Sequence, residues 1–238
     1  MEMDTIIFDV DDTLYDQALP FKITYKKLFD QPLTEAELNQ LYTVSRKHSD
    51  VLFDKWEAGE IPVQELQIRR MTQACEEFGI AITEQKALEF QNAYVKEQRK
   101  IVLFDEVKQL LDDLYQQNKQ LAVLTNGETD HQSMKIKQLN LTNWIPAEHL
   151  FISGAIGYAK PKQEVFNVLE DQLQLDTRKT IYIGDSFHHD IVGAKKAGWQ
   201  AIWMNHRKRD MPESSYKPDL EVHSAKELYE ALSRCNRL

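Results

Sequence analysis

The stretch Thr5-Ile6-Ile7-Phe8-Asp9-Val10-Asp11-Asp12-Thr13 decides the fold of this chain. Its first four residues form a β-rich run, which is typical of a short strand buried on both faces of a parallel sheet. The run ends abruptly in a group of aspartates. Because ligands bind beyond the carboxyl ends of the strands in open parallel sheets, we expect a polar site directly after this strand.

A helical period of 3.6 residues replaces the strand pattern from about residue 17 to about residue 101. Thr34 and Glu37 have the spacing of a capping box. Gly79 follows an apolar stripe as a C-terminal cap, and Thr83 precedes the next stripe as an N-terminal cap. Four consecutive amphipathic helices with short loops indicate a small bundle. We therefore expect a helical domain over residues 17–101, inserted after the first strand.

Strand and helix patterns alternate in the rest of the chain. Strands are expected at residues 120–125, 150–153, 180–184 and 200–204, with a helix before each of them. Such alternation implies right-handed crossovers and a doubly wound parallel sheet. The sequence thus predicts an α/β, Rossmann-like core from residues 1–16 plus 102–238. Residues 205–218 are polar and contain two prolines, so we expect a surface loop there.

Composition limits the class of protein and its partners. A hydrophobic content of 42% with 28% charged residues is ordinary for a soluble globular protein. The formal net charge of -9 argues against nucleic acid or an anionic membrane surface as the main partner. The two cysteines, Cys75 and Cys235, are far apart, which argues against a disulfide framework or a zinc site. With an acidic start and no long apolar run, the chain is expected in the cytoplasm. Composition gives no indication of an oligomeric state.

Polar residues gather where the expected strands end. Two residues apart on an extended chain, Asp9 and Asp11 should project to the same side and repel each other unless a cation joins them. With Asp185 from another strand end, three carboxylates suit a hard cation such as Mg²⁺. Lys160, the Thr125 hydroxyl and the backbone N–H groups around Asn126 and Gly127 would add positive charge and hydrogen-bond donors. Such a set is typical of a site for a phosphoryl group.

These motifs, in this order, resemble those of the haloacid dehalogenase superfamily of phosphatases. Its D-x-D-x-T motif is matched by residues 9–13, and its second-motif Thr or Ser by Thr125. Its third-motif lysine is matched by Lys160, and its G-D-S-x-x-x-D motif by residues 184–190. The resemblance spans nearly the whole chain, without a departure from the motif pattern.

The resemblance implies a role for each aspartate. Asp9 would attack phosphorus and form an aspartyl-phosphate. Asp11 would protonate the leaving oxygen and then activate the water of the second step. Mg²⁺ would be held by the Asp9 side chain, the Asp11 backbone carbonyl and Asp185.

The resemblance also implies which residues assist. Thr125 and Lys160 would bind the phosphoryl oxygens, beside Asn126 and Gly127. Asp190 and Ser186 would support the metal ligands without touching the substrate. Thr13 is expected to hold its loop by hydrogen bonds and to take no part in the chemistry.

The expected substrate is a small phosphate monoester. Dehalogenases of the superfamily lack an acid two residues after the nucleophile, so Asp11 favours phosphate-ester chemistry, although a sugar-phosphate mutase needs the same pair. The helical insertion resembles the cap of small-molecule phosphatases, which excludes macromolecular substrates. Residues 201–205 and the G-D-S motif look most like the noncanonical pyrimidine 5′-nucleotidase branch, which indicates a nucleoside 5′-monophosphate. Phosphoglycolate and sugar phosphatases are close alternatives.

A signalling module is the alternative from a different class. Receiver domains also carry an acid cluster, a Thr and a Lys at the ends of a parallel sheet. They are about half as long as this chain, contain no helical insertion and lack an acid at the position of Asp11. The sequence therefore favours the enzyme.

Overall fold

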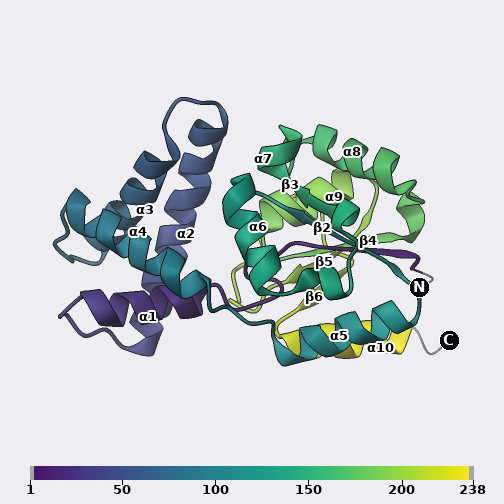
Figure 1. Cartoon of the computed structure of the whole chain (residues 1–238), viewed down its shortest axis with the longest axis horizontal. Coiled ribbons are helices and arrows are strands. Elements are labelled where there is room, and N and C mark those ends of the chain that lie inside the picture. Colours follow the sequence, from purple (N-terminus) through teal and green to yellow (C-terminus); the bar gives the residue numbers. More distant parts are fainter. Residues whose placement is uncertain (1–2, 236–238) are drawn as a thin grey trace. The chain divides into compact units, whose positions relative to one another are not determined.

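The computed structural model describes residues 3–235, which divide into two compact units, drawn in Figure 1. The larger unit contains the residues up to Asp16 and those from Ile101 onward, and the smaller unit is Gln17–Lys100. Within the described residues, each helix is too short or too polar to cross a membrane. The strands are β1 (Thr5–Phe8), β2 (Gln120–Thr125), β3 (Leu150–Ile152), β4 (Thr180–Gly184), β5 (Gln200–Met204) and β6 (Leu220–Val222). The α-helices are α1 (Ala18–Leu28), α2 (Glu35–Glu57), α3 (Val63–Glu77), α4 (Glu84–Gln98), α5 (Asp105–Gln116), α6 (Thr129–Gln138), α7 (Ser153–Ile156), α8 (Gln163–Leu173), α9 (Gly193–Lys196) and α10 (Ala225–Cys235).

All six strands form one parallel sheet in the order β3-β2-β1-β4-β5-β6. This topology confirms the predicted doubly wound, Rossmann-like sheet. The strand order reverses between β1 and β4, where Ile6 lies opposite Ile181 in the register. Ligands of such sheets bind beyond the carboxyl ends of the strands at this reversal, and residues that follow β1, β2 and β4 are therefore placed there. Strand β6, at the edge of the sheet, was not expected from the sequence.

Helices cover both faces of the sheet. Ile6 and Phe8 of β1 pack in an apolar cluster with residues of α5 and α10, which run along one face in Figure 1. Ile7 packs in a second cluster, with residues of α8 and α9. Successive residues of a strand point to opposite faces, so a run buried on both sides must be apolar throughout. The buried strands give the loops at their carboxyl ends a rigid support.

The smaller unit is a helical bundle built from α1 to α4. Its core holds a cluster of aromatic rings, in which Phe21 meets Phe90 edge to face with ring centroids 5.0 Å apart. The predicted capping box is confirmed, because Glu37 N–H donates to Thr34 Oγ1 and Thr34 N–H donates to Glu37. Ile101 was expected in this unit, but it belongs to the larger unit, where its side chain packs in the apolar cluster that includes residues of α5.

Candidate active site

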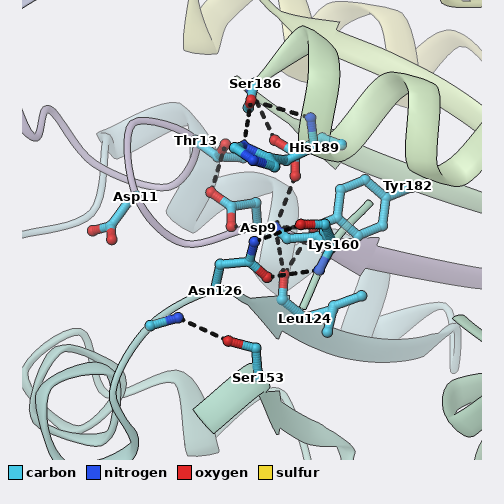
Figure 2. A network of polar contacts seen from close by, with 12 residues as sticks. Asp9, Asp11, Thr13, Leu124, Asn126, Ser153, Lys160, Tyr182, Ser186 and His189 are labelled. Carbon is cyan, nitrogen blue, oxygen red and sulfur yellow. Dashed lines mark hydrogen bonds and ion pairs between the residues drawn. The ribbon is translucent and has the colours of Figure 1, made fainter. Parts of the chain in front are cut away.

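Asp9 stands at the end of β1, in the middle of the sheet. Its backbone N–H donates to the carbonyl of Ile183 at 2.8 Å, which fixes the loop to the neighbouring strand β4. The side chain is buried and accepts a hydrogen bond from Lys160 Nζ at 2.7 Å (Figure 2). Thr13 Oγ1 lies 3.5 Å from the other carboxylate oxygen, as expected for a residue that holds the loop.

Lys160 is buried and surrounded by acceptors. Its Nζ lies 2.7 Å from oxygens of Asp9, Asp190 and Tyr182, and 3.0 Å from the carbonyl of Leu124. Burial alone would lower the pKa of Lys160, but Asp190 and Asp9 outweigh it and hold that pKa above its usual range. Lys160 is therefore a fixed positive charge. Sequence reasoning missed Tyr182, although a hydroxyl inside a buried strand needs a partner.

One ammonium does not balance the carboxylates around it. Burial raises the pKa of Asp9 from 3.8 to about 8; Lys160 opposes this shift, and the charges of Asp190, Asp185 and Asp11 add to it. Such a shift means that Lys160 alone does not offset the cost of burying the ionised form of Asp9 beside the other carboxylates. A further cation at this position would stabilise the ionised form of Asp9.

Three carboxylates lie close enough to hold that cation. One oxygen each from Asp9, Asp185 and Asp190 can be chosen so that all lie within 4.8 Å of one another. Asp190 also accepts a hydrogen bond from the Ser186 N–H at 2.8 Å, which orients it. A Cβ on Gly184 would lie 2.3 Å from Asp190 Oδ2, so this approach requires glycine. Hard divalent cations prefer oxygen ligands of this kind.

The side chain of Asp11 does not join this group. We expected Asp9 and Asp11 to project to one site, which is wrong because the extended backbone ends at Phe8. Beyond it, the N–H groups of Thr13 and Leu14 donate to the carbonyl of Val10, so the chain turns. Figure 2 shows Asp11 pointing away from Asp9.

Asp11 has its own set of partners. Lys135 Nζ lies 2.7 and 2.6 Å from its two oxygens, Gln132 Nε2 donates at 3.0 Å, and the Tyr15 hydroxyl also donates. Burial would raise the pKa of Asp11, but these donors hold it well below the usual range. Gln132 and Lys135 are three residues apart and share one face of α6. Sequence reasoning missed both, because α6 reads as a polar surface helix.

The end of β2 and the loop after it hold side chains that brace the backbone and the hydroxyl of Thr125, the last residue of the strand. Asn126 exchanges two hydrogen bonds of 2.9 Å with the backbone of Lys160. The Gly127 N–H, which we expected to be available to a phosphoryl group, donates to Ser153 Oγ at 2.9 Å. The Thr125 hydroxyl is buried and has no hydrogen-bond partner among the described residues. A buried polar atom without a partner indicates a ligand position.

The segment after β5 also reaches the site. Arg207 binds both carboxylate oxygens of Asp12, at 3.1 and 2.7 Å. Arg209 Nη2 lies 3.0 Å from Asp185 Oδ2. We expected only a surface loop at residues 205–218. These arginines fix the D-x-D-D loop and orient a candidate metal ligand.

Comparisons with known proteins agree with this geometry. A family model for haloacid dehalogenase-like hydrolases matches residues 6–204. The HAD-hydrolase YfnB of Bacillus subtilis is 29% identical, over 96% of this chain and 95% of that protein. Its magnesium-bound crystal structure superposes with a TM-score of 0.72 at 26% identity, covering 98% of this chain and 99% of YfnB.

Two relatives with named substrates also match. Pyrimidine 5′-nucleotidase PynA of Streptococcus pneumoniae is 25% identical, over 96% of this chain and 94% of its own length. Phosphoserine phosphatase of Thermus thermophilus is 30% identical, over 68% of this chain and 63% of its own. The family model covers most of the chain, and the sheet carries the motif residues at its strand ends. The chain belongs to the haloacid dehalogenase-like hydrolase family.

Proposed function

We propose that this protein is a Mg²⁺-dependent phosphatase that hydrolyses small phosphate monoesters through an aspartyl-phosphate on Asp9. The main support for this proposal is a buried ion pair, in which Lys160 Nζ lies 2.7 Å from an oxygen of Asp9. Asp9 follows β1, next to the point where the strand order of the sheet reverses. The partnerless hydroxyl of Thr125 ends the adjacent strand β2. A nucleophile, a fixed cation and an open donor are the components that phosphoryl transfer needs.

The cluster of three carboxylates, from Asp9, Asp185 and Asp190, fits Mg²⁺. Asp9 and Asp185 would provide side-chain oxygens, and the Asp11 backbone carbonyl would provide a third, as in the family motif. Asp190 is the third member of the cluster of carboxylates with Asp9 and Asp185, and it accepts hydrogen bonds from Lys160 and the Ser186 N–H. When bound, Mg²⁺ would supply the positive charge that offsets the carboxylates and an incoming phosphoryl group.

In the first step, a carboxylate oxygen of Asp9 attacks phosphorus, and the bond from phosphorus to the leaving oxygen breaks. Lys160 and the Thr125 hydroxyl hold phosphoryl oxygens during the attack. The leaving oxygen takes a proton from Asp11. To donate it, Asp11 must turn away from Lys135, because the bonds to Lys135 favour its ionised form.

In the second step, water attacks phosphorus and the bond from phosphorus to Asp9 breaks, which releases phosphate and restores the carboxylate. Asp11, ionised after the first step, accepts the proton of the water. Thr13 and the Arg207–Asp12 pair keep the loop in place through both steps. The acid two residues after the nucleophile is the feature that favours this chemistry over dehalogenation.

We further propose a nucleoside 5′-monophosphate as the substrate, hydrolysed in the cytoplasm. The proposal is supported by the similarity to a pyrimidine 5′-nucleotidase over 96% of this chain. The helical unit, Gln17–Lys100, would act as a cap that selects the leaving group. The similarity to a phosphoserine phosphatase keeps other small phosphate monoesters, including phosphoglycolate and sugar phosphates, as the second candidate class.

A panel of phosphate monoesters tests both proposals. Phosphate release would be measured with Mg²⁺ for nucleoside 5′-monophosphates, phosphoserine, phosphoglycolate, sugar phosphates and p-nitrophenyl phosphate at one concentration. Asp9→Asn should lower turnover of every substrate by several orders of magnitude. Asp130→Asn, at an exposed position of α6, is the matched control and should leave turnover unchanged. No sustained release from any substrate would refute the phosphatase, and a preference outside the nucleotides would refute only the proposed substrate.

A further inference from the structure

Two aspartates that are close in sequence bind two different lysines. Asp9 forms an ion pair with Lys160, and its carboxylate clusters with those of Asp185 and Asp190. Asp11 is only two residues further along but pairs with Lys135. The structure therefore places the Asp9 side chain among the three clustered carboxylates and the Asp11 side chain on Lys135, outside that cluster.

The binding place of Asp11 is built from buried side chains. Lys135 is 1% exposed and contacts both oxygens of Asp11. Gln132 is 3% exposed and donates to Asp11 and to the carbonyl of Asn126, both at 3.0 Å. A Cβ on Gly127 would lie 2.9 Å from Gln132 Nε2, so Gln132 packs tightly against the loop after β2. We call Lys135, Gln132 and Tyr15 the dock of Asp11. Through Gln132, the dock is fixed to the loop that directly follows Thr125.

Without the dock, Asp11 would have another partner nearby. The group of Asp9, Asp185 and Asp190 attracts a divalent cation, and more carboxylate ligands strengthen such a site. A buried carboxylate without its lysine destabilises the folded protein, so a conformation that pairs it with another positive charge is favoured. Asp11 lies two residues from Asp9, and its charge acts on Asp9. A cation held beside Asp9 would therefore attract an Asp11 carboxylate that has lost Lys135.

We propose that Lys135 is a positioning residue that keeps the Asp11 carboxylate out of the cation-binding group and so reserves it for proton transfer. This inference rests on the proposed phosphatase function. Gln132 and Tyr15 assist by taking the remaining lone pairs of the carboxylate. Lys135 acts through Asp11 and needs no contact with the substrate.

Cation binding gives the first test, and it does not depend on turnover. Lys135→Met keeps the unbranched apolar stem and removes the ammonium, and Lys137→Met, at an exposed position of the same helix, is the matched control. Titration calorimetry with MgCl₂ should show about tenfold tighter binding in Lys135→Met, because one more carboxylate can reach the cation. The double variant Lys135→Met with Asp11→Asn should return to the wild-type affinity. Unchanged or weaker binding in the single variant would overturn the proposal.

Leaving-group dependence gives the second test. In Lys135→Met, an Asp11 carboxylate bound to the cation can no longer donate a proton to the leaving oxygen. This variant should therefore lower kcat for an alkyl phosphate at least about tenfold more than kcat for p-nitrophenyl phosphate, whose leaving group needs little protonation. KM should change little, because the phosphoryl contacts remain. In an Asp11→Asn background, Lys135→Met should have almost no further effect. Equal losses on both substrates, additive with Asp11→Asn, would show a merely structural role.

Tyr15→Phe covers the case in which Lys135→Met does not fold. It removes one hydroxyl from the same dock and should produce the same selective loss, severalfold in size. If wild-type protein and Lys137→Met release phosphate while Lys135→Met and Tyr15→Phe match them on both substrates, only the inference about Lys135 fails. If the wild-type protein releases no phosphate, the proposed function fails, and the calorimetric test of the dock still stands.

Discussion

Replacing Asp9 by Asn should make the metal-free protein more stable while it abolishes turnover. Asn has nearly the shape of a protonated aspartate but cannot ionise. In the folded protein, burial and the carboxylates nearby raise the pKa of Asp9 from 3.8 to about 8. Between these two values the folded state holds a proton that the unfolded chain has already lost. The free energy of unfolding of the wild-type protein therefore falls as the pH rises through this window.

The size of the effect follows from the shift in pKa. The shift from 3.8 to about 8 is about 4 pKa units. Each unit corresponds to about 1.4 kcal/mol, so the stability lost across this pH window has a ceiling of about 6 kcal/mol. Rearrangement and water around an ionised carboxylate reduce this cost, and we expect about 2 kcal/mol in practice. For a protein of this size, 2 kcal/mol corresponds to a rise in Tm of about 4–8 °C.

The assay is thermal unfolding of both proteins in EDTA at a series of pH values. The Tm of Asp9→Asn should match that of the wild type at about pH 3 and below, where Asp9 is protonated in both the folded and the unfolded state, and exceed it increasingly toward about pH 8. Adding Mg²⁺ should reduce or reverse the difference, because the cation binds the wild-type carboxylate better. An Asp9→Asn protein that is less stable than the wild type at all pH values in EDTA would refute the charge imbalance inferred around Asp9.

Three further predictions concern the metal, the acid and a glycine. EDTA should abolish phosphate release, Mg²⁺ should restore it, and Ca²⁺ should restore it poorly, because its larger and looser coordination shell misplaces the nucleophile; full activity in EDTA would contradict the site. Asp11→Asn should lose about 10²–10⁴-fold on an alkyl phosphate and less on p-nitrophenyl phosphate, with a burst of nitrophenol in stopped flow, and equal losses without a burst would show that its role is misassigned. Gly184→Ala should cost about 3 kcal/mol in denaturant unfolding and most of the activity, because a Cβ would lie 2.3 Å from Asp190 Oδ2. A fully active, equally stable Gly184→Ala protein would contradict this prediction, because it would show that Asp190 can move away from the added Cβ at no cost.

Local patterns were enough to predict the framework of this chain. The β-rich run of β1 and the alternation after residue 102 predict the parallel sheet, because a strand buried on both faces has few other solutions. Thr34 and Thr83 predict helix starts, since an N-cap depends only on residues three positions away. The strand ends then converge by topology, which explains why Asp9, Lys160 and Thr125 could be proposed together.

Contacts between distant segments could not be predicted in the same way. Lys135 is 124 residues from Asp11, and α6 has no strong apolar stripe to show which face is buried. Arg207 is 195 residues from Asp12 and lies in a polar segment that reads as a loop. Strand β6 has three residues and an exposed Leu220, so its pattern is too short to recognise. The prediction that the Asp11 side chain points to the same site as Asp9 was wrong, because the backbone turns after β1 and is not extended as we had assumed.

The most direct test of the central claim is to trap the phosphoryl group on Asp9. Asp11→Asn lacks the base of the second step, so it should accumulate the intermediate with p-nitrophenyl phosphate and Mg²⁺. Acid quenching followed by mass spectrometry of the peptides should find one phosphoryl group on the peptide that contains Asp9, and none in Asp9→Asn. Turnover without any such adduct, or a phosphoryl group on another residue, would contradict the assignment of Asp9 as the nucleophile.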